Sequence, residues 1–281
     1  MPSRPASRVP VTVVLAASWL AVCLAAALFA DWLAPVEPTA IDLRNRLAPP
    51  VFAGGTVDHW LGTDDIGRDM FSRLLHALRV SIAVALAGSV IGAVVGTTLG
   101  FVAAHLRGVA DDAVMLGVDV QAALPFMMVA LMFMALFGTS LALFVCIVGL
   151  YGWERYARLA RGAALSLHAR GFVLAARAYN ASPARIHARH ILPNAASVLV
   201  VNATLSFPDL ILLESALSFL GLGIQPPTPS LGNMLGHGRA YLNSAWWMAV
   251  MPGLAIVLTA LSVGILGGRL QQRLGLRRTG R

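Results

Sequence analysis

Residues 172–194 read FVLAARAYNASPARIHARHILPN and form the centre of a polar, arginine-rich segment at about 154–194. Long apolar runs lie on both sides of this segment. The first part has helical spacing, which places on one face the side chains of Phe172, Ala175, Ala176 and Tyr179. The pattern therefore predicts a short helix at this point.

The rest of the segment predicts a turn and a second short helix. Asn180 suits the left-handed conformation that ends a helix, a position more often occupied by glycine. Ser182 is a favourable N-cap and Pro183 suits the first turn of the next helix, which Pro193 is expected to close. Such a helix-turn-helix at a membrane surface indicates a docking element, because loops that only connect spans are usually much shorter.

The composition indicates a polytopic membrane protein. The chain has 281 residues, of which 58% are hydrophobic and 12% are charged, values that exclude an ordinary soluble domain. Its positive charge comes from arginine alone, because the sequence contains no lysine. In a membrane protein, positive charge mainly indicates which loops lie on the cytoplasmic side. Nucleic-acid binding is therefore not favoured. Cys23 and Cys146 fall in apolar runs and indicate packing residues.

Six apolar segments are long enough, or nearly so, to cross a bilayer, which takes roughly 20 residues. The fourth is short, but its helix is expected to continue through Trp153 and Tyr156. The first is favoured as an uncleaved span over a signal peptide, since its apolar run exceeds the usual signal core. The spans are expected at 11–31, 80–104, 113–137, 139–153, 195–221 and 245–267.

The arginines predict the orientation of these spans. With the N-terminus inside, 15 of the 21 arginines fall on the cytoplasmic side: in the N-terminal residues, at Arg107, in the 154–194 segment and in the C-terminal tail. Positive residues favour the cytoplasmic side, so both termini and the docking segment are predicted to be cytoplasmic. The predicted fold is all-α, with six transmembrane helices.

The 154–194 segment resembles the cytoplasmic loop of bacterial ABC-importer permeases. That loop has the pattern Glu-Ala-Ala, three residues, Gly, about nine residues, then Ile-x-Leu-Pro, and the positions that match are Ala175, Ala176, Leu192 and Pro193. Leu174 replaces the glutamate, Asn180 replaces the glycine and Ile191 is displaced by one position. The resemblance implies that the loop contacts an ATPase subunit, with the coupling residues Phe172, Ala175, Ala176, Tyr179, Asn180, Ser182, Pro183, Arg185, Ile191, Leu192 and Pro193.

A second motif ends the long loop predicted between the first two spans. Residues 61–69, LGTDDIGRD, match in full the Leu-Gly-Thr-Asp-x-x-Gly-Arg-Asp signature of dipeptide, oligopeptide and nickel permeases, which this motif resembles. The segment is either a turn held by pairs between Arg68 and carboxylates, or a contact for a substrate-delivery protein. An acidic metal site is not favoured, because Arg68 and Arg73 balance the charge. The signature residues are Gly62, Thr63, Asp64, Gly67, Arg68 and Asp69.

The second predicted span carries a stripe of glycines spaced four residues apart: Gly88, Gly92, Gly96 and Gly100. On a helix these residues share one face and allow a neighbouring backbone to approach closely. The stripe therefore predicts a helix-packing surface, either against another span of this chain or against a partner permease.

Three acidic residues lie in or near predicted spans: Asp119, Asp209 and Glu214. Such residues usually face a cavity or a partner, and a proton-coupled carrier would use them as a relay. Pro208 predicts a break where the Asp209 carboxylate bonds freed backbone groups. No basic partner is evident at matching depth, and structural or pore-lining roles are favoured.

A third stretch, ESALSFLGLG at residues 214–223, resembles the Glu-Ala-Ser-Leu-Ser-Phe-Leu-Gly-Leu-Gly stretch of the same permeases. Three prolines in the following loop, Pro226, Pro227 and Pro229, prevent the helix from continuing. Trp246 and Trp247 are expected to anchor the last span at the outer interface.

The sequence predicts no catalytic, cofactor or metal site. His187 and His190 are spaced three residues apart but lack a third ligand nearby, and are expected to cap or line the docking helix. A phosphate-binding loop of the GxxxxGK[ST] kind would require lysine, which the chain does not contain. ATP hydrolysis is therefore assigned to partner subunits.

Together the resemblances cover about residues 59–270 and imply the second permease subunit of an ATP-driven importer in the bacterial inner membrane. The implied substrate is a di- or oligopeptide, and the implied partners are a homologous permease, two ATPase subunits, a periplasmic substrate-binding protein and membrane lipid. An importer of nickel or another small solute, a proton-coupled carrier and a structural membrane subunit remain as alternatives. The expected regions are 1–76 for the first span and periplasmic loop, 77–270 for the permease core and 271–281 for the cytoplasmic tail.

Overall fold

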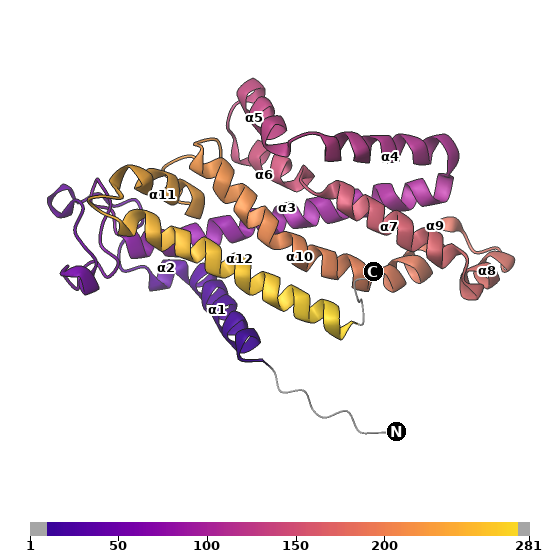
Figure 1. Ribbon diagram of the computed structural model, residues 1–281, viewed down its shortest axis with the longest axis horizontal. Coiled ribbons are helices and arrows are strands. Elements are labelled where there is room, and N and C mark those ends of the chain that lie inside the picture. The colour runs from indigo at the N-terminus through magenta and orange to yellow at the C-terminus, as the bar shows by residue number, and fades with distance from the viewer. Residues whose placement is uncertain (1–9, 275–281) are drawn as a thin grey trace. The chain divides into compact units, whose positions relative to one another are not determined.

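The structure is a computed structural model that describes residues 10–274 (Figure 1), apart from the side chains of Leu174, Arg177, Pro183 and Ala184. Every regular element in this range is helical, and an isolated β-bridge joins Thr63 to Asp69. The described chain is all-α, as the sequence predicted. Five of the arginines used above to assign the orientation lie outside the described residues: Arg4, Arg8, Arg277, Arg278 and Arg281.

Four helices are long and apolar enough to cross a membrane. They are α1 (Val11–Leu28), α3 (Met70–Leu106), α10 (Leu192–Phe219) and α12 (Trp247–Arg273). Their positions agree with the first, second, fifth and sixth predicted spans. Pro208 lies inside α10, which continues through it to Phe219, so the predicted helix break at this proline is wrong.

The third predicted span is not one straight helix. It consists of α4 (Gly108–Ala123) and α5 (Phe126–Phe137), which are bent by 93° relative to each other. Leu124 is extended, with φ −87° and ψ 134°, because the ring of Pro125 disfavours the helical conformation in the residue before it. Counted as one span, the pair brings the number of candidate spans to five.

The fourth predicted span is shorter than expected. It forms α6 (Leu141–Leu150), and Ser140 caps its N-terminus with a hydroxyl that accepts the Leu143 N–H at 3.2 Å. The helix was expected to continue through Trp153 and Tyr156, but it ends at Leu150, and Gly152 adopts φ +81°. A separate amphipathic helix, α7 (Trp153–His168), then begins. Six spans are therefore reached only if the ten-residue α6 also crosses the membrane.

The chain folds as two compact units, and the division passes through α3 and α10. The first unit contains residues up to 83 and residues 207–273, and the second contains residues 84–206. The first unit includes α1 and α12 with the short elements α2 (Ala30–Leu33), η1 (Leu43–Asn45), η2 (Val51–Ala53), α11 (Leu231–Gly238) and η4 (Arg239–Tyr241). The second unit includes α4 to α7, α8 (Gly171–Ala178), α9 (Pro183–Ile186) and the π-helical turn η3 (His187–Ile191).

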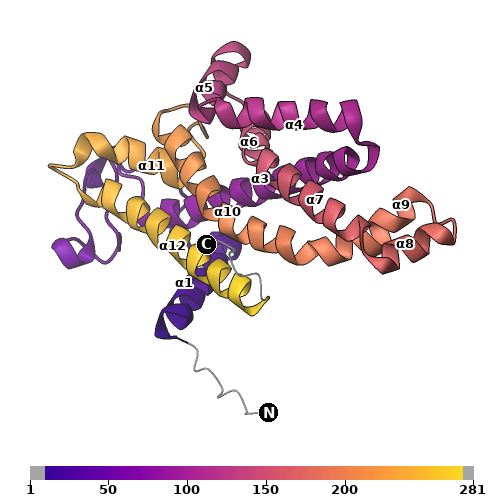
Figure 2. The same cartoon turned by 45° about the vertical axis from the view of Figure 1, so that its right-hand side comes forward.

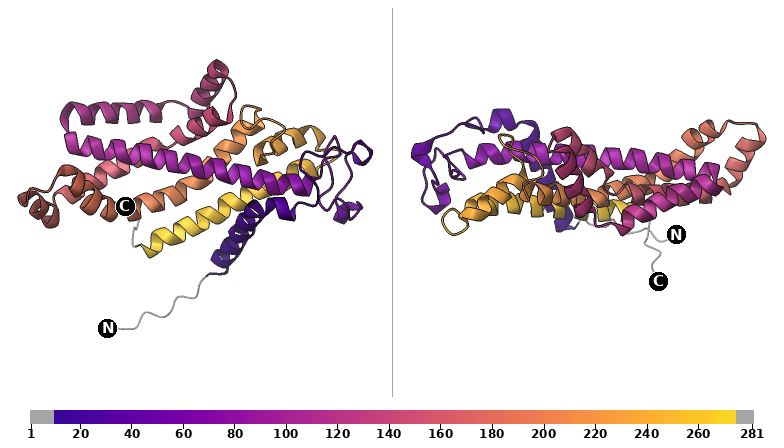
Figure 3. Two further views of the ribbon diagram at one scale, coloured as in Figure 1. Left: turned by 180° about the vertical axis from the view of Figure 1, so that it is seen from behind. Right: turned by 90° about the horizontal axis from the view of Figure 1, so that it is seen from above.

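In the first unit α1 lies alongside α12 (Figure 3), and a polar contact joins the two helices. The indole Nε1 of Trp19 donates to Oγ1 of Thr259 at 3.2 Å, and Sγ of Cys23 lies 3.7 Å from the same oxygen. Cys23 and Thr259 are both buried. Hydrogen bonds of this kind hold apolar helices together where lipid offers no polar partner.

Thr259→Val should weaken the packing of α1 on α12, because valine keeps the shape of threonine and removes the hydroxyl that Trp19 and Cys23 contact. Interhelical hydrogen bonds in membranes contribute about 0.6 kcal/mol on average, so a loss of about 1 kcal/mol is expected in the free energy of unfolding. Thermal unfolding of the purified chain in detergent measures this loss of stability. Thr204→Val is the matched control, since Thr204 donates to Val200 O in its own helix. An equal loss in both variants would contradict the assignment.

Candidate functional site

After α7, the docking segment contains two short helices joined by a tight turn. Helix α8 ends at Ala178, and Asn180 has φ +54°, the left-handed conformation predicted from the sequence. The Tyr179 N–H donates to Ala175 O and the Ala181 N–H donates to Ala176 O, both at 3.1 Å. The bond from Ala181 to Ala176 spans five residues, and Asn180, the residue before its donor, is left-handed. These two features are typical of a Schellman motif at the end of a helix.

Ser182 and Pro183 begin α9 as the sequence predicted. The Ser182 hydroxyl accepts the Arg185 N–H at 3.4 Å and the Ser182 carbonyl accepts the Ile186 N–H at 3.0 Å. Pro183 is the first residue of α9, a position where its missing N–H leaves no helical bond unmade.

Pro193 does not close this second helix, contrary to the prediction. The chain remains helical from α9 through η3 into α10, and Pro193 is the second residue of α10. In η3 the Leu192 N–H donates to His187 O, a wider turn than that of an α-helix. The widened turn precedes Pro193 and relieves the clash that proline makes with the preceding turn of a regular helix. The Asn194 side-chain amide donates to His190 O at 2.6 Å and satisfies a carbonyl in the same turn.

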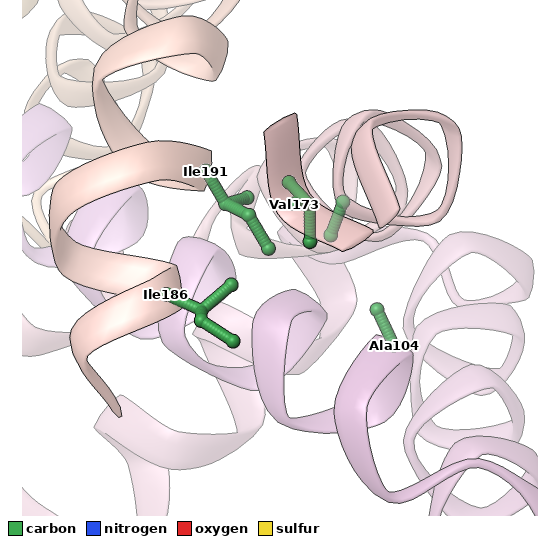
Figure 4. Packing of buried hydrophobic residues seen from close by; sticks show 5 residues of the cluster. Ala104, Val173, Ile186 and Ile191 are labelled. Atoms are coloured by element: carbon green, nitrogen blue, oxygen red, sulfur yellow. The ribbon is translucent and has the colours of Figure 1, made fainter. Parts of the chain in front are cut away.

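A small hydrophobic core supports the docking segment, and it joins α8, α9 and η3 to α3 and α7 (Figure 4). Its buried residues are Ala104, Ala164, Val173, Ile186 and Ile191. Figure 2 shows α8 and α9 beside each other at the end of α7. The short helices of this segment are therefore fixed by side-chain packing on two longer helices.

The outer face of α8, together with Tyr179 just after it, is aromatic and exposed. The exposed fraction is 44% for Phe172 and 88% for Tyr179, whereas Val173 is fully buried. The face predicted from helical spacing is thus mainly the exposed one. Arg185 and Arg189 are exposed as well. Exposed aromatic and arginine side chains on a fixed support are suited to a protein partner, because both residue types are enriched in protein interfaces.

His187 packs inside the docking segment. Its ring lies edge-on to those of His105 and His168, with ring centroids 5.3 Å apart in both pairs, and 5.9 Å from that of Phe101. His190 lies 6.2 Å from the ring of Phe172. No group of three metal-binding side chains suited to a metal ion occurs among the described residues. His105 and His168 were missed from the sequence, because nothing in their spacing links them to His187.

The glycine stripe on α3 lies against α6 and α7 of the same chain. A Cβ at Gly88 would lie 2.8 Å from Val148 Cγ1, and one at Gly92 would lie 3.0 Å from Gly149 O. At Gly96 and Gly100 it would overlap the carbonyl oxygens of Trp153 and Ala157, respectively. A larger residue at Gly96 or Gly100 would therefore push the helices apart, and one at Gly88 or Gly92 would require Val148 or the Gly149 carbonyl to shift.

Two ion pairs join α4 to α7. Arg161 binds Asp111 through two nitrogens, Nε at 2.5 Å and Nη2 at 2.6 Å. Arg158 donates to Asp119 at 2.9 Å, and both side chains are exposed. The prediction that Asp119 lacks a basic partner is therefore wrong, because the helix that supplies the arginine packs next to α4.

The signature at residues 61–69 is a turn built around a buried carboxylate. Asp64 is 2% exposed and accepts the N–H groups of Ile66 and Arg68 at 3.0 and 2.8 Å, and Nε of Arg68 at 2.6 Å. Gly67 adopts φ +82°, and a Cβ there would overlap the backbone of Asp42. Arg68 thus pairs with a carboxylate, as the structural interpretation of the motif requires.

The other signature residues tie this turn to its neighbours. Asp69 accepts the Ser72 N–H at 2.7 Å at the start of α3 and lies 3.0 Å from Nδ1 of His59. The Thr63 hydroxyl accepts the Ala48 N–H at 2.8 Å, and Thr63 O accepts the indole N–H of Trp247 at 3.0 Å. Gly62 adopts φ +78° and lies against Ala48 O.

Asp65 links the same turn to α11 and η4. Its carboxylate lies 2.8 Å from Nε2 of His237 and accepts the hydroxyl of Tyr241 at 3.3 Å. Burial alone would raise the pKa of Asp65, but the hydrogen bond and charge of His237 outweigh it, so the pKa lies below its ordinary value. The sequence did not single out His237 or Tyr241, which lie far from Asp65 along the chain.

Residues 96–276 match the family described as "Binding-protein-dependent transport system inner membrane component". The matched region covers more than half of the chain. The chain belongs to this family. It is therefore a multi-pass component of the bacterial inner membrane, and the family assembles with other permease, ATPase and binding-protein components.

Curated relatives of this inner membrane component extend the similarity over most of the chain. It is 39% identical over 257 residues to the dipeptide transport system permease protein DppC of Escherichia coli (strain K12), covering 91% of this chain and 86% of the relative. It is 37% identical over 249 residues to the di/tripeptide transport system permease protein DppC of Pseudomonas aeruginosa (strain UCBPP-PA14), covering 88% and 82%. A solved structure of the MetNI methionine ABC transporter in inward-facing conformations has TM-score 0.59 at 20% identity, covering 73% of this chain and 97% of that chain. That structure shows the same fold.

Gly96→Ala in this permease should destabilise the second unit, because the added methyl overlaps Trp153 O and the Cβ of Tyr156. Overpacking of this kind costs about 1–3 kcal/mol. Gly162→Ala in α7 is the matched control, since its Cβ would meet nothing within 4 Å, and alanine there should be neutral or stabilising by up to about 1 kcal/mol. Thermal unfolding in detergent compares the two. Loss of stability in Gly162→Ala alone would rule out the stripe as a packing surface.

Proposed function

We propose that this chain is one of two homologous permease subunits of a peptide importer, and that two partner ATPase subunits supply the energy by hydrolysing ATP. The supporting observation is the docking segment, whose exposed face carries Phe172 and Tyr179 and whose inner face is buried on α3 and α7. The named relatives, dipeptide and di/tripeptide permeases, support peptides as substrate over nickel or other solutes. A periplasmic binding protein would deliver the peptide.

In this proposal the docking segment is cytoplasmic and converts movement of an ATPase subunit into movement of the spans. The segment is rich in arginine, which favours the cytoplasmic side. Movement requires that the short helices transmit force, and the core of Val173, Ile186 and Ile191 gives them a packed base. The ATPase would bias a two-state equilibrium of the spans between inward-facing and outward-facing forms.

A proton-coupled carrier receives less support from the acidic residues. Asp119 is paired with Arg158 in an exposed position. Glu214 is fully buried, and the hydroxyls of Ser215 and Ser218 on its own helix donate to its carboxyl group. The large packed docking segment also has no role in a carrier that uses no ATPase.

The turn at Asn180 should control coupling. Asn180→Gly should be tolerated, since glycine adopts φ +54° freely, whereas Asn180→Val should not, because a β-branched side chain strongly disfavours the left-handed conformation. The valine variant should insert into the membrane normally. Its ATPase activity, stimulated by the substrate-loaded binding protein, should fall at least about tenfold, a factor that corresponds to about 1.4 kcal/mol in free energy. The measurement uses the complete complex in proteoliposomes. Wild-type stimulation of ATPase activity in Asn180→Val would show that the docking segment does not couple the ATPase subunits to the spans.

Cysteine labelling tests the orientation. In a background with Cys23→Ala and Cys146→Ala, Tyr179→Cys on the docking segment should react with an impermeant maleimide only after the cells are opened. Thr228→Cys on the proline-rich loop should react in intact cells. Both positions are exposed, so their reaction rates report sidedness rather than burial. Labelling of Tyr179→Cys in intact cells would place the docking segment outside and exclude an ATPase partner there.

A further inference from the structure

A charged cluster that the docking segment does not use joins α2 to the start of α3. Its acceptor is the carboxylate of Asp31 in α2, and its donors are His76 and Arg79 in α3. Nε2 of His76 lies 3.1 Å from Oδ1 of Asp31. Arg79 donates to both oxygens of the same carboxylate, through Nη1 at 3.1 Å and Nη2 at 3.0 Å. One carboxylate therefore meets two basic side chains of α3.

Arg79 also binds the carbonyl oxygens at the end of α1. Its Nε donates to Ala27 O at 2.6 Å and its Nη2 donates to Leu28 O at 3.3 Å. The last carbonyls of a helix carry partial negative charge, so a cation is favoured there. An arginine side chain keeps its charge throughout the physiological pH range. The Arg79 half of the cluster is therefore insensitive to pH in that range.

His76 meets an acceptor at each of its ring nitrogens. Nδ1 lies 2.9 Å from the Ser72 carbonyl oxygen, and Nε2 lies 3.1 Å from the Asp31 carboxylate. A carbonyl oxygen cannot donate a hydrogen bond, and neither can an ionised carboxylate. A neutral imidazole has one N–H and can bond only one of these oxygens, whereas an imidazolium has two N–H groups. The geometry therefore matches the doubly protonated, positively charged form of His76.

The other charged groups around His76 are consistent with this form. Glu37, in the loop after α2, lines a cavity of about 480 Å³ together with Asp31 and His76, and its negative charge favours the imidazolium. Arg79 is an opposing positive charge, but it pairs with Asp31. Arg73, on the same part of α3, pairs with a carboxylate of the signature turn. The negative groups nearest the ring therefore offset the nearby arginines.

Two further contacts hold the loop after α2 on the start of α3. The Val36 N–H donates to Ser72 Oγ at 3.4 Å, and Nη1 of Arg73 donates to Pro38 O at 3.3 Å. The residues of α3 that make all of these contacts recur at helical spacing, so one side of its first turns carries them. Residues 30–38, here called the strap, are thus fastened along α3 by side chains on one side of that helix.

We propose that His76 makes the strap a pH-sensitive latch: its imidazolium form holds residues 30–38, and with them the end of α1, on α3. Histidine changes charge near physiological pH, at about 6.5 when unperturbed, and the His76 side chain is 17% exposed, so solvent protons reach it. Loss of the proton leaves one N–H for two acceptors. The stabilisation is therefore present on the acid side of this range and is lost as the pH rises.

The proposed orientation places the latch on the outer side of the membrane. Asp31 ends the first predicted span, and His76 lies shortly before the second. The pH of the external medium would then set how firmly α1 is held on α3. This side of the membrane rests on the proposed function, whereas the latch itself is a property of the chain alone.

Hydrogen exchange in the strap tests the latch on the purified chain in detergent. The N–H groups of Leu33, Ala34 and Val36 are hydrogen-bonded in this segment. After correction for the intrinsic effect of pH, their exchange should accelerate about tenfold between about pH 5.5 and about pH 8.5, because a charge-assisted hydrogen bond is lost. Unchanged corrected exchange across this range would overturn the proposal.

His76→Gln should abolish the pH dependence, because glutamine keeps a side-chain N–H donor and does not titrate. His237→Gln is the matched control, since His237 also lies beside an aspartate, Asp65, but outside the strap. The control should retain the acceleration seen in the wild type. Retention of the acceleration in His76→Gln, or its loss in His237→Gln, would assign the effect to another group and refute the latch.

Asp31→Asn provides a second test that does not depend on the folding of His76→Gln. The change removes the carboxylate that His76 and Arg79 share, so exchange in the strap should be fast at both pH values. Asp31 is 66% exposed, so the substitution leaves no cavity in a core. Wild-type pH dependence in Asp31→Asn would overturn the proposal. Failure of the Asn180 or Tyr179 tests would count against the proposed function and leave the latch unaffected.

Discussion

The close approach of α3 to α7 is the constraint on which the second unit depends. Gly96 and Gly100 bring the backbone of α3 against the carbonyls of Trp153 and Ala157. One further step of four residues leads to Ala104, which is buried in the core under the docking segment, opposite Ala164 of α7. The glycine stripe thus continues directly into that core. The same small-residue interface sets the spacing of two helices and the position of α8 and α9, which pack on their ends.

The sequence predicted those features whose causes are local. Asn180 and Ser182 act through their own backbone bonds, so the turn between α8 and α9 could be placed to the residue. Proline was less informative. Pro125 bends the chain by 93°, whereas Pro208 lies within an unbroken α10. In a membrane no water can replace a backbone hydrogen bond that proline removes. The packing of neighbouring helices therefore decides whether a helix continues through proline. A single sequence does not contain the packing of its helices.

The sequence also did not predict the contacts between residues that lie far apart along the chain. Asp119 pairs with Arg158 and Asp65 pairs with His237, each across a long stretch of sequence. No spacing rule links such residues, because the contacts exist only after the helices have packed. The motif at residues 61–69 shows the opposite case: Arg68 and Asp64 are four residues apart, and their pairing could be predicted before the fold was known.

The docking segment has two faces, which have different requirements in the proposed mechanism. Its inner face must be immobile, and Val173, Ile186 and Ile191 are fully or almost fully buried there. Its outer face would contact an ATPase subunit, and exposed Phe172 and Tyr179 offer aromatic area at low entropic loss. Position 174 has leucine where the resembled pattern has glutamate, so the proposed contact would carry one charge fewer. Force transmission depends first on the core, since a displaced helix moves its neighbours only if close packing leaves it no room to slide.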